Sequence, residues 1–182
     1  MKSVFSLPAR VLHWVMAAMI LSMLFIGVGM VSSVSARHAV LVAVHKPLGI
    51  AILVLACVRV VVRLSSRPPG LPEDMPGWQK VAALGSHLAL YALMIAIPLI
   101  GWAMLSAGGY PVTLGGGVQL PAIVAADPVA FAWLRIAHRW VAYLFFATFL
   151  LHFAAALYCV FQAKANADSR ANRTQFPRQT ER

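Results

Sequence analysis

Four histidines stand inside or at the start of long apolar segments, where an ionisable side chain needs a function or a partner. His138 and His152 lie fourteen residues apart in one such segment, and His13 and His45 each begin another. Four turns of α-helix take about 14.4 residues, so His138 and His152 share one helix face and lie ~21 Å apart along its axis. Ionisable groups in a bilayer are costly and usually functional. The spacing therefore predicts two sites, one near each surface of a hydrocarbon layer ~30 Å thick.

The composition indicates that these histidines lie in a lipid bilayer. Of the 182 residues, 61% are hydrophobic and only 11% are charged, which a water-soluble domain of this size would not tolerate. Four segments are long enough to span a membrane, over about 12–31, 45–64, 81–105 and 131–161. None alternates between apolar and polar residues as barrel strands do. The predicted fold class is therefore all-α, an integral membrane four-helix bundle in a single domain.

The basic residues predict the orientation of the bundle. Four spans place both termini on one side, and the positive-inside rule favours the cytoplasm, since that choice puts eleven of the fifteen Lys and Arg residues there. These eleven are Lys2, Arg10, Arg59, Arg63, Arg67, Lys80, Lys164, Arg170, Arg173, Arg178 and Arg182, and the other four are Arg37, Lys46, Arg135 and Arg139. The net charge of +10 thus reflects a membrane topology, and no nucleic-acid partner is expected. Residues 164–182 are predicted to form a basic cytoplasmic tail with little fixed structure at the lipid surface.

The first apolar segment could also be interpreted as a cleaved signal peptide. Lys2 and Arg10 precede it and small residues around 34–36 follow it. Its apolar run of about twenty residues is longer than a typical signal core, so we expect a retained span.

The two cysteines give no sign of covalent chemistry. Cys57 and Cys159 fall in different spans, and neither belongs to a CxxC or CxxCH motif. Covalent haem attachment through that motif is excluded and a disulfide is not expected. Both cysteines are predicted to be small buried apolar residues.

Depth along the predicted topology pairs the four histidines. His13 and His152 fall near the cytoplasmic surface, and His45 and His138 fall near the opposite surface. Each pair joins two helices at a common depth, which suits a flat ligand in the bundle core. Two neutral imidazoles fill both axial positions of a haem iron and favour electron transfer over oxygen binding. A lone membrane histidine is more often a helix contact and zinc usually takes four ligands at one point, so the matched pairs predict two bis-histidine haems.

Two arginines precede histidines by three residues and can share their helix faces. These are Arg10 before His13 and Arg135 before His138, since residues three apart are neighbours on a helix. Both lie one turn nearer the surface, where haem propionates would point. The alternative is that these side chains extend to lipid headgroups.

Arg59 follows His45 by fourteen residues, which returns it to the same face at the depth of the inner histidines. It could bind the inner propionates or extend to headgroups. Arg63 and Arg67 are predicted to extend to headgroups, as long basic side chains near helix ends do.

His87 begins the third span at about the inner depth. It could replace His13 or His152 as a ligand, serve a bound quinone, or form a hydrogen bond across the bundle. We expect it beside the ligand pair, as a residue that supports the ligands. His38 falls in a predicted loop over 32–44 and is expected to be solvated.

The segment 106–128 is nearly uncharged and holds Gly108, Gly109 and the triplet Gly115, Gly116 and Gly117. Such a loop can lie back over the mouth of the bundle, because glycine lets the backbone come close to a ligand. A flexible connector without a role is the alternative.

Several of these motifs together resemble the bacterial cytochrome b561 family of small dihaem membrane proteins. They are His13-Trp14, His45 with Arg59, Leu99-Ile100-Gly101-Trp102, Gly108-Gly109-Tyr110-Pro111, and His138 with His152. The similarity runs from about 6 to 158. It implies a four-helix bundle in the bacterial inner membrane with two non-covalent b-type haems, whose iron ligands match His13, His45, His138 and His152.

The resemblance also implies an activity. The best-described member of the family takes electrons from periplasmic superoxide and reduces ubiquinone. Basic residues at the outer side, namely Arg37, Lys46, Arg135 and Arg139 against the single acid Asp127, would concentrate a small anion. They could equally bind propionates or headgroups.

Two other functions stay open. Related cytochrome subunits accept electrons from a dehydrogenase or hydrogenase partner, which could dock on the apolar glycine-rich loop. A haem-free membrane scaffold or metal carrier is disfavoured by the paired depths. The chain departs from the family where several members have a His-His pair, because Tyr158 and Cys159 stand there. If that pair serves quinone, the quinone end is altered, and His87 or Tyr158 could substitute.

Overall fold

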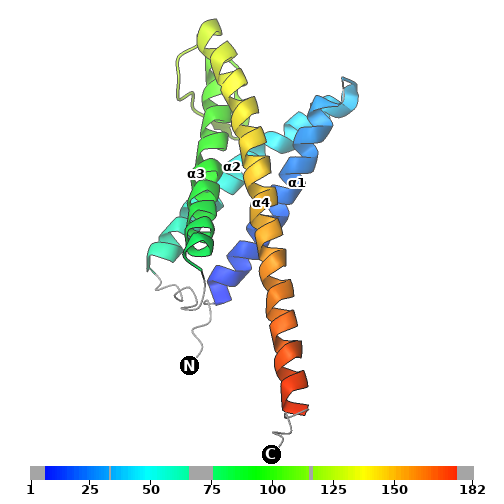
Figure 1. Cartoon of the computed structure of the whole chain (residues 1–182). Coiled ribbons are helices and arrows are strands. Elements are labelled where there is room, and N and C mark those ends of the chain that lie inside the picture. Colours follow the sequence, from blue (N-terminus) through cyan, green and yellow to red (C-terminus); the bar gives the residue numbers. More distant parts are fainter. Residues whose placement is uncertain (1–6, 33, 66–75, 115–116, 176–182) are drawn as a thin grey trace, which may run out of the picture.

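A computed structural model of the chain describes residues 7–32, 34–65, 76–114 and 117–175 (Figure 1). Its long elements are the helices α1 (Leu7–Val31), α2 (Ala36–Ser65), α3 (Gly77–Ala107) and α4 (Pro128–Gln175). Two short strands, β1 (Val112–Thr113) and β2 (Gln119–Leu120), lie between α3 and α4. Each helix is long and apolar enough to cross a membrane. The predicted fold class, an all-α membrane four-helix bundle, is confirmed.

The helices extend beyond the apolar segments that predicted them. His38 was expected in a loop, but α2 begins at Ala36 and includes it. The tail was expected to have little fixed structure, yet α4 continues to Gln175. Both predictions were wrong for one reason: hydropathy marks the hydrocarbon layer, whereas Ala, Arg, Gln and Lys are strong helix formers and continue a helix beyond it. Of the residues used to predict orientation, Lys2, Arg67, Arg178 and Arg182 lie outside the described residues.

The four helices form two antiparallel hairpins. α1 packs on α2, α3 packs on α4, and the hairpins meet chiefly through α2 against α3. Neither α1 nor α2 packs extensively against α4. In Figure 1, α1 starts and α4 ends at the lower end of the bundle. We call this end the tail side and the opposite end, which carries β1 and β2, the hairpin side.

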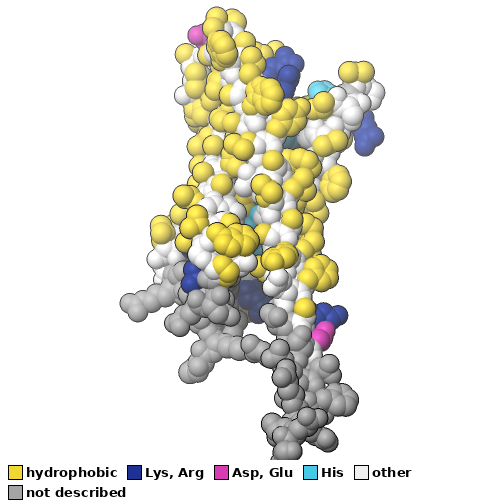
Figure 2. All heavy atoms as spheres, viewed as in Figure 1, with side chains coloured by type: hydrophobic (Ala, Val, Ile, Leu, Met, Phe, Trp, Pro, Cys, Tyr) yellow, Lys and Arg dark blue, Asp and Glu magenta, His cyan; other side chains and the backbone are white. Residues whose placement is uncertain are grey.

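The apolar core is small and lies in the middle of the bundle. Its buried side chains come from all four helices and are Met16, Ile20, Ile52, Ala56, Leu93, Met94 and Phe145. Most other large apolar side chains are exposed. Figure 2 shows hydrophobic side chains over the middle of the visible face, with Lys and Arg confined to its two ends. This distribution is the one expected where lipid, rather than water, surrounds the middle of the helices.

Both cysteines lie on the outside of the bundle. Cys57 and Cys159 are free and exposed, so the prediction of buried side chains was wrong. Cys57 directly follows Ala56, which is fully buried, and successive helical residues differ by ~100° in direction. In a helix that is apolar all round, hydropathy does not distinguish the inward face from the lipid face.

The end of α3 is fixed by a glycine in the left-handed conformation. Gly109 has φ +70°. The Tyr110 N–H donates to the Leu105 carbonyl at 2.9 Å and the Gly109 N–H donates to the Ser106 carbonyl at 3.0 Å. This pair of bonds is the Schellman arrangement that ends many helices. It turns the chain away from the helix axis and back toward the bundle.

The segment between α3 and α4 is held against α3. The Trp102 Nε1–H donates to the Pro121 carbonyl at 2.9 Å, and the Ile123 N–H donates to the Ser106 hydroxyl at 3.2 Å. Strand β1 pairs with β2 in antiparallel register and contacts α2 as well as α3. Of the two interpretations of this segment, the structure supports the one in which it folds back over the bundle.

We expect Gly109→Ala to lower the free energy of unfolding by about 1–2 kcal/mol, because a Cβ in the left-handed conformation crowds the following carbonyl. Gly27→Ala in α1 is the matched control, since nothing lies within 4 Å of a Cβ placed at Gly27. Thermal unfolding of both variants in one detergent measures the difference. Equal midpoints for the two variants would contradict the assigned role of Gly109.

Candidate functional site

At the hairpin side, α2 and α4 bring two histidines together. The rings of His45 and His138 have centroids 6.2 Å apart and an interplanar angle of 72°. The Nδ1 atom of each ring is buried and has no hydrogen-bond partner among the described residues. The backbone of Ile97 approaches His138 without meeting the geometry of a hydrogen bond from Nδ1. Two polar side chains thus face each other in an apolar environment without a protein partner for either Nδ1.

Helix α3 supplies one wall of this site through Gly101. A Cβ placed at Gly101 would lie 3.1 Å from Cε1 and 3.4 Å from Nδ1 of His138. Only glycine lets the α3 backbone approach the imidazole so closely without displacing it. Gly101 therefore fixes the position of the His138 ring.

The hairpin-side pair fits a bis-histidine haem. Two imidazoles from facing helices, with no partner for either Nδ1 among the described residues, are the donor set that would hold a haem iron. The rings of His45 and His138 are 6.2 Å apart. Buried Nδ1 atoms of axial histidines commonly donate to a nearby carbonyl, and Ile97 provides a backbone group beside His138. The donor set is one that would hold a haem between α2 and α4.

At the tail side, three histidines from three helices gather. His87 of α3 and His152 of α4 have ring centroids 5.3 Å apart at 56°. His13 of α1 is near enough to both to interact with them electrostatically. The sequence predicted His13 and His152 as a pair with His87 beside them. The structure brings all three together, and the direct ring contact of His152 is with His87.

Arg59 links this cluster to a tyrosine that the sequence did not indicate. Its Nε donates to the Tyr91 hydroxyl at 2.9 Å, and its Nη2 donates to Nδ1 of His13 at 3.1 Å. A guanidinium has donors only, so Nδ1 of His13 is the acceptor. Tyr91 follows His87 by four residues, which puts both on one face of α3. That spacing is the signal that could have found Tyr91.

Arg63 was predicted to extend to lipid headgroups, but in the structure its side chain lies beside Tyr91. Its guanidinium carbon lies 5.9 Å from the centre of the Tyr91 ring, the same distance as that of Arg59. We call the set His13, His87, His152, Arg59, Arg63 and Tyr91 the tail-side cluster. Arg67, for which the same prediction was made, lies outside the described residues.

The other predicted site residues lie on the outside of the bundle. Arg10 and Arg135 are exposed, one turn before their histidines in the unbroken helices α1 and α4. Arg37 and Arg139 are also exposed, whereas Lys46 is half-buried. Within the described part of the chain, the side chains of these five make no hydrogen bond or ion pair. They are therefore available to an anion at either end.

Tyr158 and Cys159 do not join the tail-side cluster. Both are exposed, and the Tyr158 hydroxyl accepts a hydrogen bond from Nε2 of Gln162 at 2.6 Å. Of the two residues considered as substitutes for the family's His-His pair, only His87 lies beside His152.

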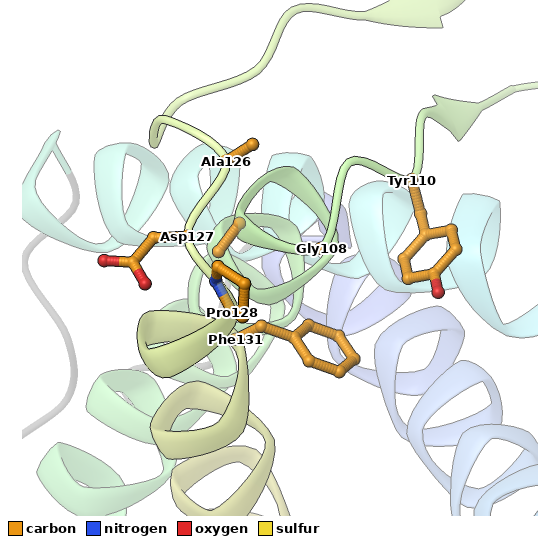
Figure 3. Close-up of a pocket in the computed structure, with 7 residues that line it drawn as sticks. Gly108, Tyr110, Ala126, Asp127, Pro128 and Phe131 are labelled. Carbon is orange, nitrogen blue, oxygen red and sulfur yellow. The ribbon is translucent and has the colours of Figure 1, made fainter.

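A pocket of about 320 Å³ lies where α3 ends and α4 begins. Figure 3 shows the rings of Tyr110 and Phe131 turned to one side of Gly108, with the Asp127 carboxylate pointing away from both rings. Oδ1 of Asp127 accepts the Val129 N–H at 2.8 Å and so caps α4. The pocket's one carboxylate is therefore engaged in holding the helix start, and the rest of the lining is uncharged, with the Tyr110 hydroxyl as its other polar side-chain group.

The described residues contain no group of three or more His, Cys, Asp or Glu side chains arranged to hold a single metal ion. Each end of the bundle instead presents flat rings from facing helices. The arrangement suits a planar ligand at each end more than a tetrahedral ion.

Comparison with known proteins identifies relatives of this chain. A model of the prokaryotic cytochrome b561 family matches residues 4–165. Cytochrome b561 homolog 2 of Escherichia coli K12 is 31% identical over 148 residues, which cover 80% of this chain and 78% of that protein. A probable superoxide oxidase CybB of Yersinia pestis is 33% identical over 115 residues, covering 63% of this chain and 64% of that protein.

We expect Gly101→Ala to lower the haem content of the hairpin-side site, because the new methyl group would press against the His138 ring. Gly85→Ala on the same helix is the control, since nothing lies within 4 Å of a Cβ there. Pyridine haemochrome analysis of the purified variants gives haem per chain. The same haem content in both variants would show that His138 tolerates the displacement.

Proposed function

The chain belongs to the prokaryotic cytochrome b561 family, and from that premise we propose that it is a dihaem oxidoreductase that oxidises superoxide and reduces membrane quinone. Membership makes it a multi-pass electron-transfer protein of the bacterial inner membrane, with b-type haem and with lipid around its helices. The number of haems, their ligands and the two substrates belong to the proposal.

The His45–His138 pair carries the proposal. Its centroid separation of 6.2 Å and the unpartnered Nδ1 atoms support one haem at the hairpin side. Haem iron between two imidazoles supplies one-electron storage with no open coordination position. The two side chains hold the iron from α2 and α4, and Gly101 keeps the His138 ring in place. Arg135, one turn away on α4, is the proposed partner of a propionate.

For the tail side we propose a second haem that His13 and His152 would hold. His13 would then bind iron through Nε2, and its proton would stand on Nδ1 in place of the contact with Arg59. His152 lies four turns after His138 on one continuous helix, which supports a second site at the other end. His87 is the alternative to His13, supported by its ring contact with His152. Arg10 and Arg59 are proposed to bind propionates, because each lies within one turn of His13 or in contact with it.

We assign the hairpin side to the periplasm and both termini to the cytoplasm. Arg37, Lys46 and Arg139 then face the periplasm and draw superoxide toward the hairpin-side pair. Each superoxide loses one electron and becomes dioxygen. Two such electrons, together with two protons, convert one ubiquinone to ubiquinol. The similarity to a protein named probable superoxide oxidase supports this substrate.

A docked redox protein is the second candidate electron donor. The hairpin-side segment exposes apolar side chains, with Tyr110 56%, Val118 57% and Ile123 45% exposed. In the proposed orientation these side chains project from the membrane on the donor side, where they favour contact with a partner. A dehydrogenase or hydrogenase subunit of this kind would be the electron donor in place of superoxide. The role of the two haems would stay the same.

The first experiment is a dithionite-reduced minus air-oxidised spectrum of the purified protein with a haem count, followed by stopped-flow mixing with superoxide. We expect two b haems per chain, reduced at ~10⁸ M⁻¹s⁻¹ without any partner. Two haems with slow reduction by superoxide would favour the partner-dependent function. A count of zero or one would refute the dihaem proposal.

We expect His45→Ala to remove the hairpin-side haem and leave the tail-side haem, because the two sites have no histidine in common and are separated by the apolar core. The superoxide reaction should be lost with it. Haem per chain and the reduced spectrum measure the outcome. Loss of both haems from this single change would mean that the two sites do not form independently.

We expect Arg37→Glu together with Lys46→Glu to slow the reaction with superoxide and to flatten its dependence on salt, since steering of a small anion depends on local charge. Stopped-flow rates over a range of ionic strength measure this. Lys164→Glu, on an exposed part of α4 at the tail side, is the control and should leave the superoxide rate unchanged. An unchanged rate in the double variant would assign these residues to the lipid surface.

A further inference from the structure

Tyr91 of α3 lies between two arginines of α2 in the tail-side cluster. Nε of Arg59 donates to its hydroxyl at 2.9 Å. The guanidinium carbons of Arg59 and Arg63 each lie 5.9 Å from the centre of its ring, within the range of a cation–π contact. The arginines are four residues apart on one helix. One side chain of α3 thus orders two cations of α2.

Among the described residues, no acidic side chain neutralises the positive charges of Arg59 and Arg63. Within the described residues, neither Arg59 nor Arg63 pairs with a carboxylate; Glu73 and Asp74 lie outside those residues. Tyr91 offers each arginine its ring face, and its hydroxyl also accepts from Arg59, but it carries no negative charge. Two like charges one turn apart repel each other. They lie together in a half-buried position, which favours the binding of an anion between them.

The hydrogen-bond donors of the two arginines indicate which class of anion would bind beside them. Guanidinium groups present planar donor pairs that match a carboxylate in two-pronged contact. Arg59 donates at two points, with Nε to Tyr91 and Nη2 to His13. Only the contact with Tyr91 can persist when His13 binds iron through Nε2, because Nδ1 of His13 would then carry the proton. Without the hydroxyl of Tyr91, a long basic side chain near a helix end would extend toward the membrane surface. Tyr91 therefore decides whether the arginines stay beside the histidines.

We propose that Tyr91 is a positioning residue which holds Arg59 and Arg63 beside the tail-side histidines as a carboxylate-binding pair. The inference rests on the proposed function, because the carboxylates are those of the haem assigned to these histidines. It adds a positioning role for Tyr91 and includes Arg63 among the residues that bind the carboxylates. Tyr91 acts through the arginines and not by ligation.

The positive charge of Arg59 would affect the reduction potential of the tail-side haem. A fixed positive charge near a haem disfavours the ferric form, which carries one more positive charge than the ferrous form, and so raises the reduction potential. Loss of the Tyr91 hydroxyl releases Arg59 and should move the potential of the tail-side haem to more negative values. Because the hydroxyl acts through Arg59, its removal should add nothing once Arg59 is neutral.

The experiment is a spectroelectrochemical titration of the full-length protein and four variants. Tyr91→Phe keeps the ring and removes the hydroxyl, and Arg59→Gln removes the charge. Their combination tests whether the two act together. Tyr143→Phe is the control, because Tyr143 is an exposed tyrosine of α4 that contacts Trp140 through its ring alone. Transfer of haem to apomyoglobin gives a second readout, the retention of haem at the tail side.

We expect Tyr91→Phe to shift the tail-side potential to more negative values and to speed haem loss from that site, with the hairpin-side haem unchanged. Arg59→Gln should shift it further, the double variant should match Arg59→Gln, and Tyr143→Phe should match the parent protein. If Tyr91→Phe does not fold, Arg63→Gln replaces it and should also shift the tail-side potential to more negative values.

Two results would overturn the inference. The first is a reduction potential of the tail-side haem in Tyr91→Phe equal to that in the parent protein. The second is a shift of this potential by Tyr91→Phe that is equally large whether residue 59 is Arg or Gln. A parent protein with two haems and an unshifted variant refutes the role of Tyr91 alone. A parent protein that lacks the tail-side haem refutes the proposed function as well, and the haem count reveals this before any variant is made.

Discussion

A polar side chain in the interior of a membrane bundle must find a partner, because lipid offers none. The two ends of this bundle meet that requirement differently. His45 and His138 face each other at the hairpin side, and their Nδ1 atoms have no hydrogen-bond partner among the described residues. At the tail side, Arg59 bridges a tyrosine and a histidine. The chain itself therefore supplies polar partners at the tail side, whereas the described residues supply none for the two Nδ1 atoms at the hairpin side.

The packing of the helices is consistent with this need of polar side chains for partners inside the bundle. α1 with α2 and α3 with α4 form the close contacts, and α4 approaches α1 and α2 less. His138 of α4 faces His45 of α2 across this wider separation, whereas His152 contacts His87 of the closely packed α3. Between the two ends, Met16, Ile20 and their neighbours form an apolar core without a polar side chain. That core keeps the two histidine groups chemically separate while a single bundle holds both.

The sequence predicts the elements better than the contacts between them. The four apolar segments and the spacing from His138 to His152 were sufficient for the helices and for histidines at both ends of the bundle, and the set of motifs was sufficient for the resemblance to the family. The contacts of Tyr91 and Gly101 depend on how each helix is rotated and on which neighbour it meets. A helix that is hydrophobic on every face carries little information about its rotation. The lipid-facing position of Cys57 and the helical position of His38 were missed for related reasons, since hydropathy reports neither the inward face nor a helix end in the interfacial region.

The continuity of α4 has a consequence for how this chain can vary. His138 and His152 belong to one unbroken helix, so a single residue inserted between them would turn one imidazole by ~100° relative to the other and move it by ~1.5 Å along the axis. No loop lies between them to absorb the change. Substitutions along this stretch of α4 can therefore accumulate one at a time, whereas a change in its length would require the facing helices to alter in the same step.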